Sequence, residues 1–592
     1  MERLTDPETM AVVVATAEPG SGGAEAGGVE DAEGPPGAEA FDGDAEAADA
    51  EAGATDTDAG ATDTGAVAGA ALVPFGCTGE QAATSRATRT AQQARMAIRS
   101  YARRVAPSLC DTPPMAPDSS PASPSATDPV RGDGPGLLRA IEARLPELKL
   151  LEDPLDRESY RRDETAYLPT GLPLAVALPV ATDQVAELVR LCGEFDVPIV
   201  PRGAGTGLSG GAAGIEGALT VAFTRMNRVL EIDHENLLVV TQPGVVNADL
   251  KKAVAAEGLF YAPDPASYET CTIGGNLGTN AGGLCCVKYG VTRDAVLGLE
   301  VVMAGGQVMR LGGRNVKDVA GYGLIPLLVG SQGTLGLVTE ATLRLRAAPP
   351  PRATLLAFFP SLDAAGEAVA GIIRAGIVPV TLELMDRTTI RAVDDVHRLG
   401  LDRDAAAMLL VESDLPGTAA VAEVDAAEAA CAVVGAGLVV RAQDATEAEW
   451  LREGRRLAYR ALEAQGVARM EDVGVPRSRV PELLRAIEAI AATHAITVGT
   501  FGHAGDGNLH PTFILGRDEP ETTAAARLHA AREDLYTAAL ALGGTVTGEH
   551  GIGAARRDWL VRQRGEPAVE AMRAIKRALD PQGLLNPGRV LA

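Results

Sequence analysis

Cysteine is scarce in this chain, with seven residues in 592, and no two of them form a C-x-x-C pair. Zinc ribbons and iron–sulfur clusters depend on such closely spaced cysteines, so the sequence encodes neither of them. An odd number of scattered cysteines also argues against a disulfide framework. Any redox chemistry therefore has to use a centre other than a metal–sulfur cluster held by this chain.

Long apolar runs and an excess of basic residues are missing as well. No window of eighteen consecutive apolar residues occurs, and the first residues lack the basic and then apolar pattern of a secretory signal. The 53 basic residues are outnumbered by 79 acidic ones, whereas a nucleic-acid binder needs a basic face. We expect a cytoplasmic protein, soluble or peripheral at a membrane, that binds no nucleic acid.

Aromatic residues make up only 3% of the chain, and this dilution has a local cause. Residues 1–64 hold 17 acidic residues and one basic residue, Arg3, and so carry −16 of the total charge of −26. Residues 1–135 are dominated by Ala, Gly, Asp, Thr, Ser and Pro, which cannot bury enough apolar surface to offset chain entropy. We predict that residues 1–135 form a disordered acidic extension.

From residue 136 onwards, apolar runs typical of strands alternate with amphipathic stretches typical of helices. One expected helix covers 183–195, with Thr182 as its N-cap. Strands are expected at 173–179, 197–200, 218–223, 237–242, 298–303, 335–345, 354–359 and 407–412, with further helices at 137–145, 364–375, 419–434 and 567–579. Three prolines at 349–351 break the pattern. The predicted domains are 136–348 and 349–565, followed by a C-terminal helix and tail, 566–592, that returns to the first domain.

A glycine-rich loop, RGAGTGLSGG at 202–211, follows one of these apolar runs. Residues 205–210 satisfy G-x-G-x-x-G, but a dinucleotide fingerprint must open a helix, and this loop leads into another strand. An NAD site is therefore excluded by context. The loop is either a plain connector or a backbone cradle for a diphosphate, since glycine lets N–H groups approach a ligand closely.

A second glycine- and amide-rich block spans residues 263–290 and includes the runs 271–276 and 280–283. Two such loops in succession favour one long ligand over two unrelated connectors. Together with the runs 317–322 and 330–336, they resemble the FAD-binding domain of the vanillyl-alcohol oxidase superfamily. The D-lactate dehydrogenase and glycolate oxidase FAD-subunit branch is similar over residues 139–592.

This resemblance implies an α+β fold, with a vanillyl-alcohol-oxidase-type (PCMH-type) FAD-binding domain and an antiparallel-sheet α+β cap domain for the substrate. It also implies that the first loop holds the FAD diphosphate and that the second block surrounds the flavin. Some members attach the flavin to a histidine of the first loop, which is absent here, so we expect noncovalent FAD. Gln332 and Gly323 depart from the residues usual in the family. The expected cofactor contacts are Arg202, Gly203, Gly205, Thr206, Gly207, Ser209, Gly210, Pro263, Asp264, Ser267, Thr272, Gly274, Gly275, Asn276, Asn280, Gly282, Gly283, Tyr289, Gly336, Val338 and Asn586.

Three of the seven histidines fall in two short polar motifs, GHAGDGNLH at 502–510 and GEHG at 548–551. Two imidazoles and a carboxylate, His503, His510 and Glu549, can form a three-ligand site with open positions, as in catalytic zinc sites. The spacing alone equally allows an iron oxygenase site. Because a flavin already supplies the redox centre, we expect a divalent ion, with zinc first. The resemblance agrees with these ligands and implies that His550 is the catalytic base.

A 2-hydroxy acid also needs a cation for its carboxylate, and the resemblance favours Arg455 as that catalytic-site arginine, against the alternative of a surface arginine. Met470 stands where related D-2-hydroxyglutarate dehydrogenases have a lysine for a second carboxylate. The sequence therefore favours a small monocarboxylate.

The expected activity is FAD-dependent oxidation of D-lactate or glycolate to the 2-oxo acid, with hydride transfer to flavin N5. The electrons would then pass to a quinone, a cytochrome or an iron–sulfur partner subunit. Three alternatives stay open: an enzyme similar to D-2-hydroxyglutarate dehydrogenases, a nonredox transferase similar to alkylglycerone-phosphate synthases, and a catalytically silent flavoprotein subunit. The exact acid, the acceptor and the oligomeric state are not specified by these patterns.

Overall fold

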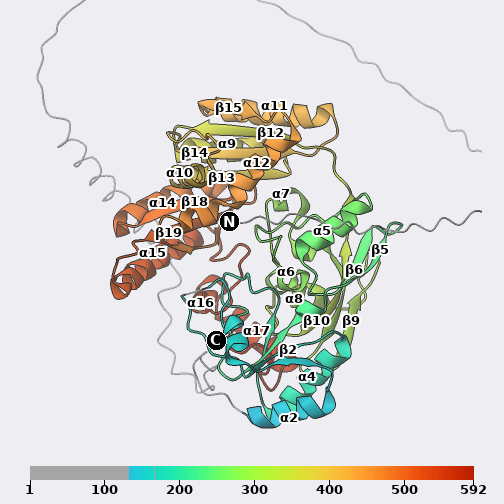
Figure 1. Ribbon diagram of the computed structural model, residues 1–592. Helices are drawn as coiled ribbons and strands as arrows, with labels where there is room; N and C mark the ends of the chain where they lie inside the picture. Colours follow the sequence, from blue (N-terminus) through green and yellow to red (C-terminus); the bar gives the residue numbers. More distant parts are fainter. Residues whose placement is uncertain (1–131, 166, 592) are drawn as a thin grey trace, which may run out of the picture. The chain divides into compact units, whose positions relative to one another are not determined.

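The computed structural model describes residues 132–165 and 167–591, all of which belong to one compact unit of the chain. The predicted disordered extension falls almost entirely on residues 1–131, outside the described part. The described chain contains three main sheets with helices packed on them (Figure 1).

The first sheet has four strands in the order β1, β2, β4, β3, and its last three strands are parallel. Strands β2 and β4 are buried along their whole length, which explains why they read as continuous apolar runs. Helices α2 and α4 pack against the sheet and complete its core. The elements are β1 (Lys149–Leu151), β2 (Ala175–Leu178), β4 (Leu219–Ala222), β3 (Ile199–Arg202), α2 (Gly134–Arg144), α3 (Pro154–Ser159) and α4 (Thr182–Phe195).

One expectation about this region is wrong: Thr182 does not cap α4. The helix begins at Thr182 itself, and the residue before it, Ala181, has no side chain able to cap. The Thr182 hydroxyl instead donates to Glu300 Oε1 at 2.6 Å, on a strand of the second sheet. The hydroxyl that the local sequence assigned to the helix N-terminus therefore bonds a residue that is distant in the sequence.

The second sheet is antiparallel, in the order β5, β6, β10, β8, β9. Burial alternates residue by residue along β10, so one face of that strand packs on the core. The elements are β5 (Val229–Asp233), β6 (Leu238–Thr241), β8 (Val296–Val302), β9 (Val308–Gly312), β10 (Leu337–Arg344), α5 (Asn247–Ala256), α6 (Ile273–Thr279), α7 (Cys286–Tyr289) and α8 (Leu324–Leu328), with a small pair β7 (Leu259–Phe260) and β11 (Arg346–Ala347).

The third sheet is antiparallel, in the order β15, β12, β14, β13, β18, β19, β16, with β17 also paired to β19. Side chains of β12 alternate between two cores, because Leu355 and Phe359 point to one face and Leu356 and Phe358 to the other. Helices α9, α11, α14 and α15 cover the first face, and α10, α12 and α13 the second (Figure 1).

The strands of this part are β12 (Ala353–Phe359), β13 (Thr381–Asp386), β14 (Ala407–Ser413), β15 (Leu438–Arg441), β16 (Val467–Met470), β17 (Val473–Gly474), β18 (Thr497–His503) and β19 (Asn508–Leu515). Its helices are α9 (Leu362–Arg374), α10 (Arg387–His397), α11 (Thr418–Val433), α12 (Ala445–Arg456), α13 (Ala458–Glu463), α14 (Val480–His494) and α15 (Glu521–Ala541). The order β13, β18, β19, β16 places the hairpin of β18 and β19 between two strands from earlier parts of the chain.

The chain ends with helices α16 (Arg557–Arg564) and α17 (Glu566–Leu579) and a tail that adds to the first sheet. Leu585 forms a parallel bridge with Ile199, and the Asn586 N–H donates to the Ile199 carbonyl at 2.8 Å. The Lys576 amine donates to the Thr334 carbonyl at 2.7 Å. The tail is thereby fixed to the part of the chain that carries the first glycine loop.

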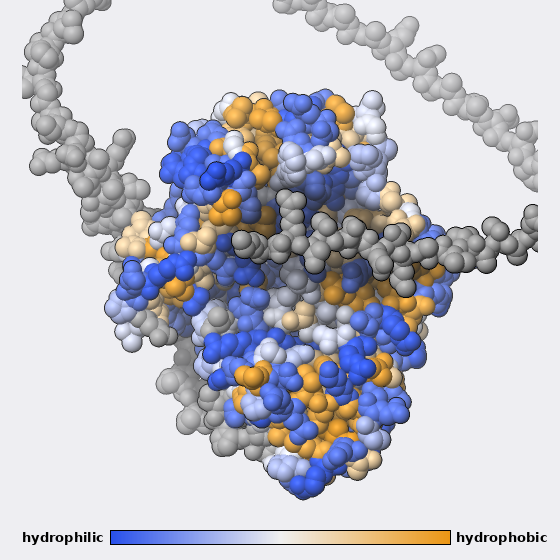
Figure 2. All heavy atoms as spheres, in the orientation of Figure 1, coloured by the Kyte–Doolittle hydropathy of each residue, from blue (hydrophilic) through white to orange (hydrophobic). Residues whose placement is uncertain are grey.

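Within residues 132–165 and 167–591, no helix is both long and apolar enough to cross a membrane. The face drawn in Figure 2 mixes hydrophilic and hydrophobic residues. Large exposed apolar side chains come from several separate elements, including Leu155, Val319 and Trp450.

Candidate active site

A cavity of about 450 Å³ is lined by both glycine-rich segments and by residues of the third sheet and its helices. Of the residues expected to contact the cofactor, Arg202, Gly203, Gly205, Thr206, Gly207, Ser209, Ser267, Thr272, Gly274, Gly275, Asn276, Gly282, Gly336 and Val338 lie in its wall. The cavity also contains all five residues expected to be catalytic or to bind metal: Arg455, His503, His510, Glu549 and His550. Sequence motifs more than 300 residues apart therefore meet at one cavity.

The first loop requires glycine because the chain is folded tightly on itself. Gly205 has φ of +84°, and a Cβ there would lie 2.1 Å from a guanidinium nitrogen of Arg202. A Cβ on Gly203 would lie 2.4 Å from the hydroxyl of Thr272, in the second block. The loop connects parallel strands β3 and β4 without a helix between them, as its sequence context predicted.

Arg202 supports this loop from behind. Its guanidinium donates to the carbonyls of Arg162 at 2.9 Å and Ala212 at 3.1 Å, and its side chain is buried. These bonds use the charged end for the protein's own backbone. Arg202 therefore lines the cavity as part of the loop, while its guanidinium group hydrogen-bonds the protein's own backbone.

The second block forms a capped turn of helix. Thr272 is the N-cap of α6, and its hydroxyl accepts a hydrogen bond from the Gly275 N–H at 3.3 Å. Asn276 lies inside this turn, where its side-chain oxygen accepts from Asn247 Nδ2 at 3.1 Å. The cap leaves Gly274 and Gly275 in the cavity wall with no side chain between their backbone and the cavity.

Seven of the expected cofactor contacts lie outside the cavity wall: Gly210, Pro263, Asp264, Asn280, Gly283, Tyr289 and Asn586. Several of them support the loops that form the wall. Asp264 Oδ1 accepts from the Cys285 N–H at 3.1 Å, and Asn586 Nδ2 donates to the carbonyls of Gly211 and Gln332 at 2.9 and 2.7 Å. The Tyr289 hydroxyl donates to a carboxylate oxygen of Asp414, the residue that follows β14. Their direct contact with a cofactor stays a prediction.

Gln332 stands where the family usually has a carboxylate, and both ends of its side-chain amide form hydrogen bonds. Its Nε2 donates to the Ser209 hydroxyl at 2.9 Å, and its Oε1 accepts from the Gly553 N–H at 2.8 Å. A carboxylate could accept the second bond but could not donate the first. The amide therefore links the first glycine loop to the chain that follows His550.

Three imidazoles converge on Glu549 at one end of the cavity. Its Oε1 lies 3.3 Å from His510 Nε2, 3.4 Å from His503 Nε2 and 3.8 Å from His550 Nε2. One ligand-type atom from each of His503, His510 and Glu549 lies within 4.8 Å of the other two. The expected ligands and the expected base are thus brought together.

Glu383, which the sequence did not suggest, holds one of these histidines from the other side. Antiparallel pairing of β13 with β18 places it beside His503, and its Oε1 lies 2.7 Å from His503 Nδ1. Its Oε2 lies 2.6 Å from Arg455 Nη2, and the carboxylate is only 1% exposed. Arg455 is itself 2% exposed and lies over the Phe501 ring. Arg455 is therefore a buried cation with a built-in counterion.

Asp472 is a second carboxylate that the sequence did not suggest. It is fully buried and lies 3.8 Å from His510 Nδ1 and 3.9 Å from His550 Nδ1. The two imidazole rings are stacked, with centroids 5.1 Å apart. An acidic residue near a strand is usually exposed. The sequence links Asp472 with the site only by placing it two residues after Met470.

Burial and neighbouring charges shift the pKa values of His503 and His550 in opposite directions. Burial alone would lower the pKa of His503, but the carboxylates of Glu383 and Glu549 raise it well above its usual value. Burial lowers the pKa of His550 to about 4, with Asp472 opposing part of that shift. Burial would raise the pKa of Glu549, yet His503 holds it well below its usual range. At neutral pH, His550 is an uncharged imidazole beside an ionised carboxylate.

The remaining wall near the cluster is largely apolar, with Met470, Tyr459, Leu457 and Phe501. Arg456 also lines the cavity and lies over the Tyr268 ring. Unlike Arg455, it was not favoured in advance, and its nearest carboxylate oxygen, on Glu449, is 3.3 Å away. This part of the cavity therefore places Arg455 and Arg456 beside an apolar wall.

Comparison with known families gives two matches in order along the chain. Residues 173–312 match the FAD binding domain, and residues 348–590 match the C-terminal domain of FAD linked oxidases. The FAD-binding cavity expected from the glycine loops is consistent with the first match.

Curated relatives cover most of the described chain. The glycolate oxidase subunit GlcD of Bacillus subtilis is 46% identical over 71% of this chain and 90% of that protein. The D-lactate dehydrogenase of Anaerostipes hadrus is 34% identical over 77% and 97%, respectively. The D-2-hydroxyglutarate dehydrogenase of Xanthomonas citri pv. viticola is 35% identical over 76% and 96%.

Solved structures confirm the expected fold at low identity. A 4-ethylphenol oxidase from Gulosibacter chungangensis has a TM-score of 0.65 at 18% identity and covers 78% of this chain and 98% of its own. An alkyldihydroxyacetonephosphate synthase has a TM-score of 0.61 at 20% identity, with 81% and 90% covered. The family matches and the 46% identity to a full-length relative go further, and they show that this chain belongs to the FAD-linked oxidases.

Proposed function

We propose that the protein oxidises a small 2-hydroxy acid, D-lactate or glycolate, to the 2-oxo acid, with FAD as the immediate electron acceptor. The observation that carries this proposal is the meeting of two glycine-rich loops with a buried His, His, Glu, His cluster at one cavity. Relatives named for glycolate, D-lactate and D-2-hydroxyglutarate share a 2-hydroxy acid as their substrate class.

The cavity fits FAD in size and lining. Its volume of about 450 Å³ lies within the range of small-molecule and cofactor sites. Gly203, Thr206 and Ser209 would hold the diphosphate through N–H and hydroxyl groups, and Gly274 and Gly275 would lie against the flavin. No histidine occurs in residues 202–217, so the cofactor would be noncovalent. Bound FAD supplies a two-electron acceptor for the substrate's hydride.

The cluster also fits a divalent ion, with zinc as the expected one. Two imidazole nitrogens and one carboxylate oxygen are a donor set typical of catalytic zinc sites with open positions. The contact of His503 Nδ1 with Glu383 matches the outer carboxylate that orients metal-binding histidines. A cation would displace the proton that His503 otherwise retains. Such an ion polarises the hydroxyl and carboxylate oxygens of a bound 2-hydroxy acid.

His550 would act as the base. Its Nε2 faces the cluster, and its lowered pKa keeps it neutral at pH 7, so a lone pair is available. It would take the hydroxyl proton of the substrate while the Cα–H bond faces the flavin. Burial excludes bulk water from this step.

Arg455 would bind the substrate carboxylate. Its charge is paired with Glu383, but its Nε is buried and has no hydrogen-bond partner within the described chain. A substrate carboxylate would satisfy that donor. The apolar wall at Met470 and Tyr459 suits a small side chain and leaves a second carboxylate without a partner.

D-2-hydroxyglutarate is the second candidate substrate, supported by the 35% identical relative and opposed by Met470. A nonredox transferase has only the low-identity fold match in its favour, and the histidine-rich run of such enzymes is absent from the sequence. Electrons would leave to a quinone, a cytochrome or a partner subunit, and the B. subtilis relative is itself named a subunit. A cytoplasmic location stays a prediction.

Anaerobic addition of D-lactate, glycolate or D-2-hydroxyglutarate to the FAD-loaded protein tests the proposal. Oxidation of the correct acid should bleach the flavin band near about 450 nm, whereas a transferase or a silent subunit leaves the flavin oxidised. If none of the three acids bleaches the flavin, the proposed substrate class is wrong.

Two groups of variants separate the ion from the base. His503→Ala and Glu549→Ala should lower metal content, and added divalent ion should restore part of the activity. His550→Ala should retain metal and FAD while flavin reduction slows by about two to four orders of magnitude. A metal-free protein that is fully active and insensitive to EDTA would contradict the assigned ligands.

A further inference from the structure

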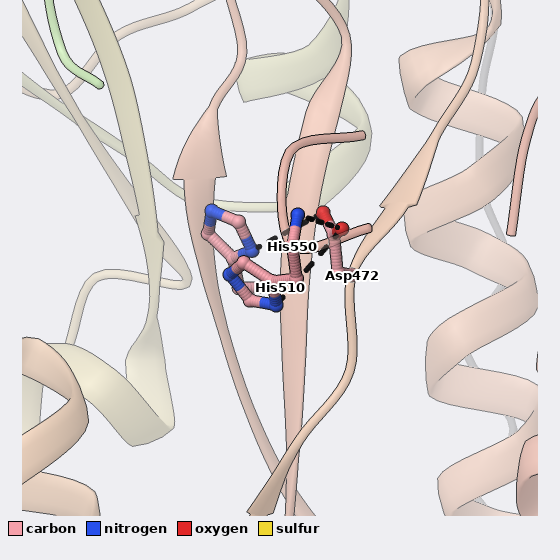
Figure 3. Close-up of side chains that lie close together, drawn as sticks. All are labelled: Asp472, His510 and His550. Atoms are coloured by element: carbon pink, nitrogen blue, oxygen red, sulfur yellow. Dashed lines mark hydrogen bonds and ion pairs between the residues drawn. The ribbon is translucent and has the colours of Figure 1, made fainter. Parts of the chain in front are cut away.

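One buried carboxylate lies behind both stacked imidazoles of the cluster. His510 is on β19, His550 is in the loop before α16, and Asp472 lies between β16 and β17. Figure 3 shows these side chains together, with the two rings beside the carboxylate. The Nδ1 atoms of both rings are buried and have no hydrogen-bond partner among the residues that the structure describes, and each lies within 3.9 Å of an Asp472 oxygen.

The carboxylate is held in place by a set of donors. Oδ2 accepts from the Thr547 hydroxyl at 2.6 Å and from the backbone N–H groups of residues 548, 549 and 550 at 2.9, 3.1 and 2.9 Å. Oδ1 accepts from Asn508 Nδ2 at 2.8 Å. Donors of this number favour the ionised form, so Asp472 is a fixed negative charge.

The same donors argue against a second metal ion between Asp472 and the two rings. Oδ2 already accepts from four donors, and an ion bound to it would have to displace backbone N–H groups that have no other partner among the described residues. The two Nδ1 atoms therefore face a carboxylate that is held by five hydrogen bonds and can interact with them electrostatically.

A neutral imidazole has one N–H group and one lone pair, and its surroundings decide which nitrogen holds the proton. A lone pair directed at a buried carboxylate is repelled, whereas an N–H group is attracted. Both rings direct Nδ1 towards Asp472 and Nε2 towards Glu549. The favoured tautomer thus has the proton on Nδ1 and the lone pair on Nε2.

We propose that Asp472 is a positioning residue that fixes His510 and His550 in this tautomer and stabilises the imidazolium formed when His550 accepts the substrate's proton. The inference rests on the proposed function, because it assigns His550 Nε2 as the acceptor. The proton moves from the substrate hydroxyl to His550 Nε2, and the Nδ1 proton stays in place. Asp472 does not line the cavity, so it would act through the two histidines and not by contact with substrate or cofactor.

A matched pair of isosteric variants, Asp472→Asn and Glu471→Gln, tests this role. Glu471 is the adjacent residue and is 1% exposed; among the described residues its ion pairs are with Arg532 at 2.7 Å and Arg556 at 3.5 Å, and not with a histidine. Flavin reduction by the substrate is followed anaerobically in the FAD- and metal-loaded protein. D472N should slow the reduction by roughly 10²- to 10⁴-fold at saturating substrate, with little change in the half-saturating concentration. E471Q should lose thermal stability and keep its reduction rate.

A second measurement does not depend on turnover. Nitrogen-15 NMR of histidine-labelled full-length protein should show the His550 ring protonated at Nδ1 in the wild type and a changed tautomer in D472N. His550→Gln identifies the resonance. If D472N does not fold, the wild-type spectrum decides alone.

Each outcome has one meaning. Wild-type reduction rates in D472N, or a wild-type His550 protonated at Nε2, would overturn the role of Asp472. Equal slowing in D472N and E471Q would also overturn it, since a general loss of structure would then suffice. Failure of every 2-hydroxy acid to reduce the wild-type flavin would instead refute the proposed function, and the NMR result would still stand.

Discussion

Replacement of Glu383 by glutamine should damage the site in two separable ways. In the wild type, its carboxylate binds His503 Nδ1 at 2.7 Å and neutralises Arg455 Nη2 at 2.6 Å, and both partners are buried. Glu383→Gln preserves size and removes the charge. Arg455 then remains buried without a counterion, and His503 loses the anion that orients its ring.

The structure sets the expected magnitudes. Removing one partner of a buried ion pair costs about 3–5 kcal/mol, because the other charge is left uncompensated. Glu383 and Arg455 are 1% and 2% exposed, so solvent screening will reduce this cost little. Loss of an outer carboxylate behind a metal-binding histidine typically costs about 10- to 100-fold in metal affinity. The two losses fall on different partners, Arg455 and His503, so stability and metal retention measure them separately.

Four proteins measure both effects: wild type, E383Q, R455M and the double variant. Chemical denaturation of the FAD-loaded proteins should show that the double variant loses less stability than the sum of the two single variants. Competition with EDTA should show weaker metal retention in E383Q and in the double variant but not in R455M. Additive stability losses would refute the ion-pair argument, and unchanged metal retention in E383Q would refute the orientation of His503.

Three further predictions follow from single positions. Met470→Lys should raise kcat/KM for 2-hydroxyglutarate relative to D-lactate, since a second carboxylate gains a cation; an unmoved ratio would contradict the proposed pose. Gly282→Ala should weaken metal binding in an EDTA titration, because the new Cβ would lie 2.5 Å from Glu549 Oε2. Burial raises the pKa of Asp386 to about 6, so its stabilising contribution is present at pH 4 and lost as pH rises through 6. Between pH 4 and 7, the unfolding free energy of D386N should therefore rise by about 2 kcal/mol relative to wild type, and equal pH slopes would refute it.

The sequence predicted the fold best where strands are buried on both faces. The runs expected at 354–359 and 407–412 correspond to β12 and β14 within a residue or two, because such strands consist of continuous apolar residues. The N-cap at Thr182 failed because a hydroxyl can bond outside its helix, and Glu300 lies 118 positions away. Local patterns contain no information about such a partner.

The candidate site was likewise predictable only in part. His503, His510 and Glu549 stand among glycines and polar residues, where an apolar core has no use for them, so their clustering indicated chemistry. Glu383 and Asp472 gave no such signal, since Glu383 is a single acidic residue within an apolar strand and Asp472 is one of two acidic residues that follow another strand. Their positions depend on strand order, which brings β13 and β16 to either side of the β18–β19 pair.

The charges around the cluster support the assignment of Glu549 as the residue that meets a cation. Glu383 is paired with Arg455, and Asp472 is held by Asn508, the Thr547 hydroxyl and three backbone N–H groups. Within residues 132–165 and 167–591, the ion pairs of Glu549 are with imidazoles alone. Its charge is therefore balanced only when an imidazole is protonated or a cation is bound. Because two of these imidazoles have their outer nitrogens turned to Asp472 and the third is bound by Glu383, all three present Nε2 to the same carboxylate oxygen. A cation beside this oxygen would balance the charge of Glu549 and meet imidazole nitrogens that are already oriented towards it. That position lies next to His550, the proposed base.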